Sequence, residues 1–144
     1  MDVSFLAPVL QSTGPYATVC ADVTHVTEDA DTELELRVRG LCERLAGTGA
    51  PQPVLDAVRE RLLQGTEDGD AAQLTGRALV VAADGSVLLD TPLARAPLRE
   101  TVDWAPLPDV TTVLRQLPGR VPHVVVVADR VGADITVEVT PSTS

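Results

Sequence analysis

The 144-residue chain is predicted to fold as an α/β protein of the α+β sandwich type, with a mainly antiparallel sheet covered by an antiparallel helix pair. Two segments in which apolar residues recur at helical spacing, joined by about five residues, predict the helix pair. Short alternating or apolar runs between turn residues predict the strands. A hydrophobic fraction of 44% and a charged fraction of 22% are typical of a globular domain.

The chain is expected to begin with a short helix followed by a strand. Residues 2–10 place four apolar side chains at helical spacing, and Pro8 limits this helix to one or two turns. Gly14 and Pro15 then end it. Residues 16–23 alternate between apolar and more polar side chains, which predicts a half-buried strand.

The helix pair is expected at residues 32–47 and 51–64. Thr32 and Glu35 have the spacing of a capping box, and Gly49 can adopt the left-handed conformation after the first helix. Apolar residues at steps of three and four should face the core, together with one residue from each of two strands. These predicted core residues are Leu34, Val38, Leu41, Leu45, Val54, Val58, Leu62, Val19 and Val80.

A β-hairpin is expected at residues 77–89, because Asp84-Gly85 lies between two apolar runs. Residues 66–75 are expected to form an exposed loop. Residues 91–108 are expected to be irregular because they contain four prolines. A short helix at 109–117, capped by Asp109, should join the helix pair on one face of the sheet.

The last segment differs from the rest. Val124 to Val127 with Ala128 form a continuous apolar run typical of a strand buried on both faces, and residues 133–140 alternate after a turn. A strand of that kind needs a layer on each side. We therefore expect a C-terminal hairpin that starts a second domain, with a first domain at residues 1–120, a truncated middle domain at 121–144, and more polypeptide after Ser144.

Charge restricts the classes of partner. The chain has 11 Arg, no Lys and 21 acidic residues, for a net charge of −10. Binding to a polyanion needs a cationic surface, so this fragment alone is not expected to bind free nucleic acid. The first cation is Arg37, and the longest aliphatic run is far shorter than a membrane span. We expect a cytoplasmic protein without membrane contact, in which Cys20 and Cys42 are reduced, buried thiols.

No catalytic, cofactor-binding or metal-binding set is expected. His25 and His123 are isolated, and the acidic run at 28–35 lacks the glycine and final glutamate of a calcium loop. No phosphate-binding glycine motif occurs. Glu33 and Arg37, like Glu35 and Arg39, have the i,i+4 spacing of solvated ion pairs.

One segment is a candidate for binding a partner. Arg95 and Arg99 give a local cationic excess near Trp104, the single tryptophan. An exposed aromatic with two arginines could form a contact surface. The alternative is that Trp104 fills the core.

Several short motifs, taken in order, resemble a known family. They are Met1 to Leu6, Gly14 to Val19, Glu33 to Arg37, Gly76 to Leu79, Trp104 to Pro108 and Val121 to Ala133. Together they resemble the start of the bacterial relatives of the archaeal and eukaryotic peptide-chain release factor and Pelota family. This broad group includes Balon-like ribosome-hibernation factors.

The resemblance implies a three-domain protein that enters the ribosomal A site. Its amino-terminal domain would approach the decoding centre, and its middle domain would open with a hairpin like residues 124–139. The chain has neither the Gly-Gly-Gln of release factors nor, without lysine, their Asn-Ile-Lys-Ser motif. No catalytic residue is therefore carried over.

The favoured function is a non-catalytic amino-terminal module of a ribosome-associated protein in translation, hibernation or rescue. Its partners would be rRNA and ribosomal proteins, reached through the full-length protein. Two alternatives remain. The full-length protein could be a peptidyl-tRNA hydrolase whose catalytic residues lie outside this chain, or the chain could be a plain interaction module that forms a homodimer through its C-terminal hairpin.

Overall fold

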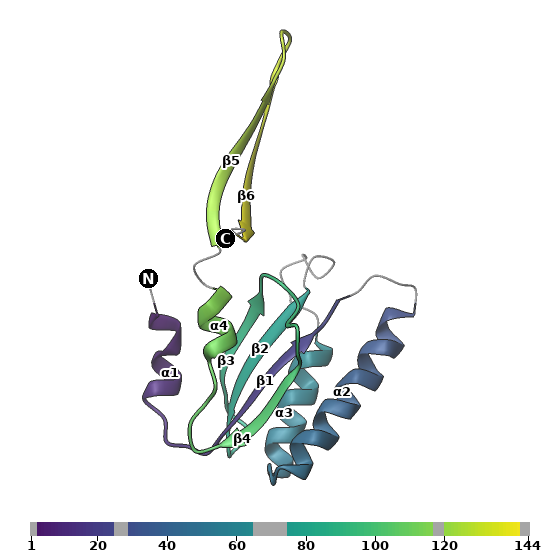
Figure 1. The fold of residues 1–144 in the computed structure, drawn as a ribbon, viewed down its shortest axis with the longest axis vertical. Coiled ribbons are helices and arrows are strands. Elements are labelled where there is room, and N and C mark those ends of the chain that lie inside the picture. Colours follow the sequence, from purple (N-terminus) through teal and green to yellow (C-terminus); the bar gives the residue numbers. More distant parts are fainter. Residues whose placement is uncertain (1–2, 25–28, 65–74, 117–119, 142–144) are drawn as a thin grey trace.

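The structure is a computed structural model that describes residues 3–24, 29–64, 75–116 and 120–141, with 30, 120–123 and 137–141 described as backbone only. Its main body is a four-stranded antiparallel sheet between two helical layers (Figure 1). The predicted α/β class and antiparallel sheet are confirmed.

The sheet has the strand order β3-β2-β1-β4, and every neighbouring pair is antiparallel. Its strands are β1 (Tyr16–Asp22), β2 (Gly76–Ala82), β3 (Val87–Leu93) and β4 (Thr101–Ala105). The helices α2 (Ala30–Gly47) and α3 (Gln52–Leu63) cover one face. The short elements η1 (Ser4–Leu6), α1 (Ala7–Leu10) and α4 (Thr111–Gln116) cover the other.

All nine predicted core residues are buried, and the most exposed of them, Leu34, is only 7% exposed. Eight of them belong to the cluster between the sheet and the pair α2/α3. Val80 belongs to the cluster on the opposite face, where Val113 of α4 and Val9 of α1 also pack. The short helix therefore lies on the face opposite to the one we expected, because Val113 is buried against that second cluster.

β1 is buried on both faces, so the prediction of a half-buried strand is wrong. Thr18 and Cys20, which point away from the helix pair, are 2% and 1% exposed. The second helical layer covers them, and the hydroxyl of Thr18 accepts a hydrogen bond from the backbone N–H of Asp109 at 3.1 Å. The buried hydroxyl is thus satisfied.

The prediction of an irregular segment at 91–108 is wrong in part. β3 continues through Pro92 to Leu93. Proline has no backbone N–H group, and an edge strand such as β3 tolerates it because one side of that strand needs no hydrogen-bond donors. β4 lies within the same segment and pairs with β1. Val102 and Trp104 alternate along β4 and pack against the helix-pair cluster, which explains why it forms a strand.

The start of α2 also differs from the prediction. The helix begins at Ala30 with Asp29 as N-cap, so Thr32 lies in the first turn and makes no capping box. The predicted end is confirmed. Gly49 has a φ of +100°, and the N–H groups of Gly49 and Ala50 donate to the carbonyls of Ala46 and Leu45, which together form a Schellman motif.

The predicted hairpin between β2 and β3 is confirmed. Gly85 has a φ of +89°, and the backbone N–H of Ser86 donates to Asp84 Oδ1 at 2.9 Å. A Cβ at position 85 would lie 2.9 Å from the carbonyl oxygen of Pro53, so this turn packs closely on the start of α3. The loop predicted at 66–75 lies almost entirely outside the described residues, as does His25.

The predicted C-terminal hairpin is present as a separate two-stranded sheet of β5 (Arg120–Ala128) and β6 (Ala133–Pro141), here called the ribbon. Figure 1 shows it extending away from the layered body. Val124 to Val127 are between 37% and 65% exposed, so no described part of this chain buries both faces of β5. The division into domains at 1–120 and 121–144 stays a prediction.

Candidate functional site

The ribbon carries the most exposed apolar surface of the described chain. Val126 pairs with Ile135 across the two strands, and Val124 shares their face because it lies two residues before Val126. These three side chains are 58%, 57% and 69% exposed for Val124, Val126 and Ile135. One face of the ribbon is therefore apolar and open to solvent.

The opposite face of the ribbon is mixed. Val125 pairs with Thr136, and Val127 pairs with Asp134. Directly opposed residues of an antiparallel pair share a face, so each valine there lies beside a polar residue. The ribbon is amphipathic, and its apolar face lacks a covering layer in the described chain.

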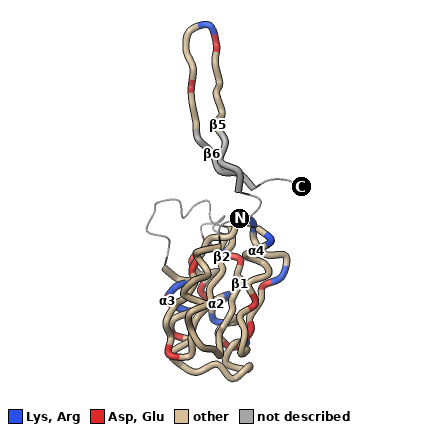
Figure 2. The backbone as a smooth tube through the Cα atoms, turned by 90° about the vertical axis from the view of Figure 1, so that its left-hand side faces the viewer, with Lys and Arg blue, Asp and Glu red and all other residues tan. Residues whose placement is uncertain are grey.

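The tip of the ribbon is closed by Asp129. Its carboxylate accepts hydrogen bonds from the backbone N–H groups of Val131 at 2.7 Å and Gly132 at 2.8 Å. These bonds lower the pKa of Asp129 because they stabilise the charged form. Figure 2 shows charged residues at this tip, whereas the neighbouring valine run is uncharged.

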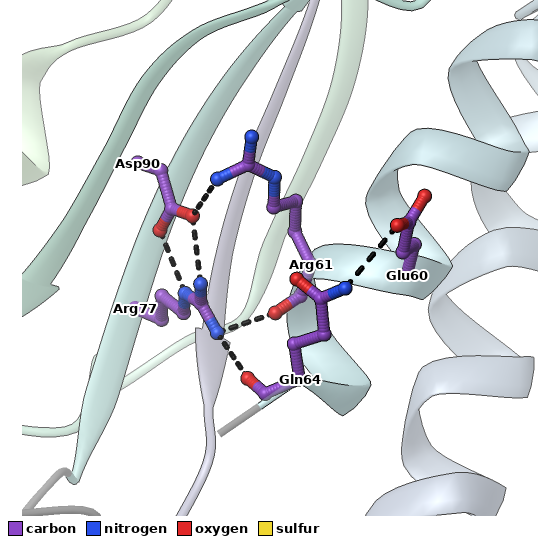
Figure 3. A network of polar contacts seen from close by, with 5 residues as sticks. All are labelled: Glu60, Arg61, Gln64, Arg77 and Asp90. Atoms are coloured by element: carbon purple, nitrogen blue, oxygen red, sulfur yellow. Dashed lines mark hydrogen bonds and ion pairs between the residues drawn. The ribbon is translucent and has the colours of Figure 1, made fainter. Parts of the chain in front are cut away.

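A polar cluster around Arg77 lies inside the body and was not predicted. Arg77 of β2 is only 7% exposed, and its guanidinium makes two hydrogen bonds of 2.7 Å to Asp90 of β3 (Figure 3). Its Nη1 also donates to the carbonyl of Gln64 at 2.8 Å and to that of Arg61. The side chain of Arg61 reaches Asp90 at 3.3 Å.

This network supports the fold. The carbonyls of Arg61 and Gln64 are at the C-terminal end of α3, where an α-helix has unpaired carbonyls and a partial negative charge. Arg77 satisfies two of them and pins the helix to β2 and β3. Four of its five N–H donors are used by protein acceptors, so we assign Arg77 a structural role.

A groove runs along the outer surface between α2 and α3. It has a volume of about 300 Å³, and its walls include Cys42, Leu55 and Leu63 with charged residues around them. The thiol of Cys42 is half-buried and donates to the carbonyl of Leu55 at 3.9 Å. Burial raises the pKa of Cys42, and Asp56 adds to this against the opposing effect of Arg59. The thiol is therefore a poor nucleophile at neutral pH.

The other cysteine is enclosed in the body. Cys20 is 1% exposed on the central strand, and burial raises the pKa of its thiol. Both cysteines are free, as predicted, but only Cys20 is fully buried. Neither thiol is available as a reactive thiolate at neutral pH.

Arg37 connects α2 to the end of β1 and to the loop before β4. Its Nη1 donates to the carbonyl of Asp22 at 2.8 Å, and its guanidinium lies 3.9 Å from carboxylate oxygens of Asp22 and Glu100. Burial alone would raise the pKa of Asp22, but hydrogen bonds from Thr24 and the charge of Arg37 outweigh it and lower that pKa. The predicted Glu33–Arg37 pair is therefore replaced by contacts with the sheet.

The three predicted partner-binding residues are not gathered on one face. Trp104 packs on the helix-pair face of the sheet and is partly buried there. Arg95 lies beside α4, where its backbone N–H and carbonyl both bond to the side chain of Gln116. Arg99 is exposed in the loop before β4. Partner binding through Arg95, Arg99 and Trp104 stays a prediction.

The described part of the chain offers neither a metal site nor a membrane-spanning helix. Among residues 3–24, 29–64, 75–116 and 120–141, no three His, Cys, Asp or Glu side chains are grouped so that they could hold a metal ion. Within the same ranges, no helix has both the length and the apolar character that crossing a membrane requires. Comparison with models of protein families and with curated proteins gives no match for this chain.

Proposed function

We propose that this chain is a non-catalytic amino-terminal module of a release-factor-like protein that associates with the ribosome. Its role is to position the protein, in the context of translation, hibernation or rescue. The order of the sequence motifs supports the family, and a cytoplasmic location follows from the function. The observation that carries the proposal is the ribbon, whose apolar face lies outside a body that has its own buried clusters.

The contrast between body and ribbon supports an interaction role. The buried clusters on the two faces of the sheet already cover β1 and β2, and the buried arginine is satisfied by Asp90 and the end of α3. The two clusters therefore account for the apolar side chains that the sheet carries on its two faces. The valines of the ribbon have no such account within the described chain, which is typical of a surface that another domain or another molecule covers.

Charge restricts the ribosomal partner. A net charge of −10 opposes contact with RNA phosphates and favours contact with basic ribosomal proteins. We assign peptidyl-tRNA hydrolysis no residue of this chain, because Gly-Gly-Gln does not occur in it.

Sedimentation with ribosomes tests the proposal. The full natural protein is followed through sucrose gradients of lysates from growing and from starved cells, and we expect it in ribosomal fractions in at least one state. Its absence from those fractions in both states would refute the proposal.

A matched pair of variants locates the contact. Val126→Thr changes the ribbon, and Leu36→Thr changes an exposed leucine of α2; these residues are 57% and 58% exposed. We expect the first substitution to reduce the ribosome-bound fraction and the second to leave it unchanged. Equal effects would show that the ribbon has no special part in the contact.

A further inference from the structure

We draw no further inference here: the strongest candidate, the surface groove between α2 and α3 whose walls include Cys42 and Leu55, is lined by charges of both signs, and nothing in the structure shows what covers it.

Discussion

Replacing Arg77 should destabilise the body, because its buried guanidinium joins α3 to the sheet. Its side chain is 8% exposed and Asp90's is 16% exposed. Arg77→Met keeps most of the aliphatic packing but removes the two bonds to Asp90 and the two to the end of α3. Removing one partner of a buried ion pair costs about 3–5 kcal/mol.

The structure places Arg77→Met at the lower end of this range, at about 3 kcal/mol. Asp90 retains the Nη1 of Arg61 at 3.3 Å and some contact with water, so its charge is not left alone. Asp90→Leu leaves the less exposed Arg77 without a carboxylate and should cost more, about 4 kcal/mol. The double variant removes both charges and should cost only about 1–2 kcal/mol, which gives a coupling energy of several kcal/mol.

Urea unfolding at neutral pH measures these free energies, with the fluorescence of Trp104 as the signal, since this single tryptophan packs against the helix-pair cluster. Arg59→Met is the matched control, because Arg59 is an exposed arginine of α3, the helix that Arg77 binds, and it faces the surface groove. We expect its effect to stay within about 0.5 kcal/mol.

Two outcomes would refute the reasoning. If Arg77→Met and Arg59→Met had equal effects, the buried network would contribute nothing beyond a surface arginine. If the double variant lost the sum of the two single losses, Arg77 and Asp90 would act independently, and their two short contacts would have no energetic meaning.

Three further predictions concern the body. Leu41→Ala, at a residue 3% exposed, should lower the free energy of unfolding by about 2–5 kcal/mol, measured by urea unfolding. Gly85→Ala should cost about 1–3 kcal/mol in the same assay because of its positive φ and the nearby Pro53 carbonyl, whereas Gly40→Ala, with open space around it, should stabilise by about 1 kcal/mol. The pKa of Asp22 is lowered in the folded state, so its carboxylate stabilises the fold at pH values above the unfolded-state pKa of about 4, and this stabilisation is lost as the pH falls further. Asp22→Asn should therefore lower the free energy of unfolding at pH 7 and match the parent in acid, measured by urea unfolding at both pH values.

Helical periodicity identified the core, because a period of 3.6 residues fixes which side chains of α2 and α3 face the sheet. Leu34, Leu41 and Val58 are buried for this reason. The same logic failed for β1, where Thr18 and Cys20 look like a solvent face. Alternation reports only that a strand has two different faces, and the layer of α1 and α4 that buries the second face comes from distant parts of the chain.

β4 and Arg77 were missed for different reasons. The prolines around β4 dominate its pattern, and a five-residue strand offers only Val102 and Trp104 as alternation. The signal for Arg77 was present. Arg77 lies two residues before Leu79 in β2, so both side chains are on the face that packs against the helix pair. A charge at such a position needs a buried partner, which Asp90 supplies from the neighbouring strand.

The apolar strands β1 and β5 differ in burial: β1 is buried on both faces, and the valines of β5 are exposed. β1 has a strand on each side and helices over both faces, whereas β5 has only β6. Apolar sequence therefore predicts that a strand will be covered, and the neighbouring elements decide what covers it. Since the two clusters of the body close without the ribbon, its valines add nothing to those clusters. We predict that the layer that covers these valines belongs to the second domain that this hairpin starts.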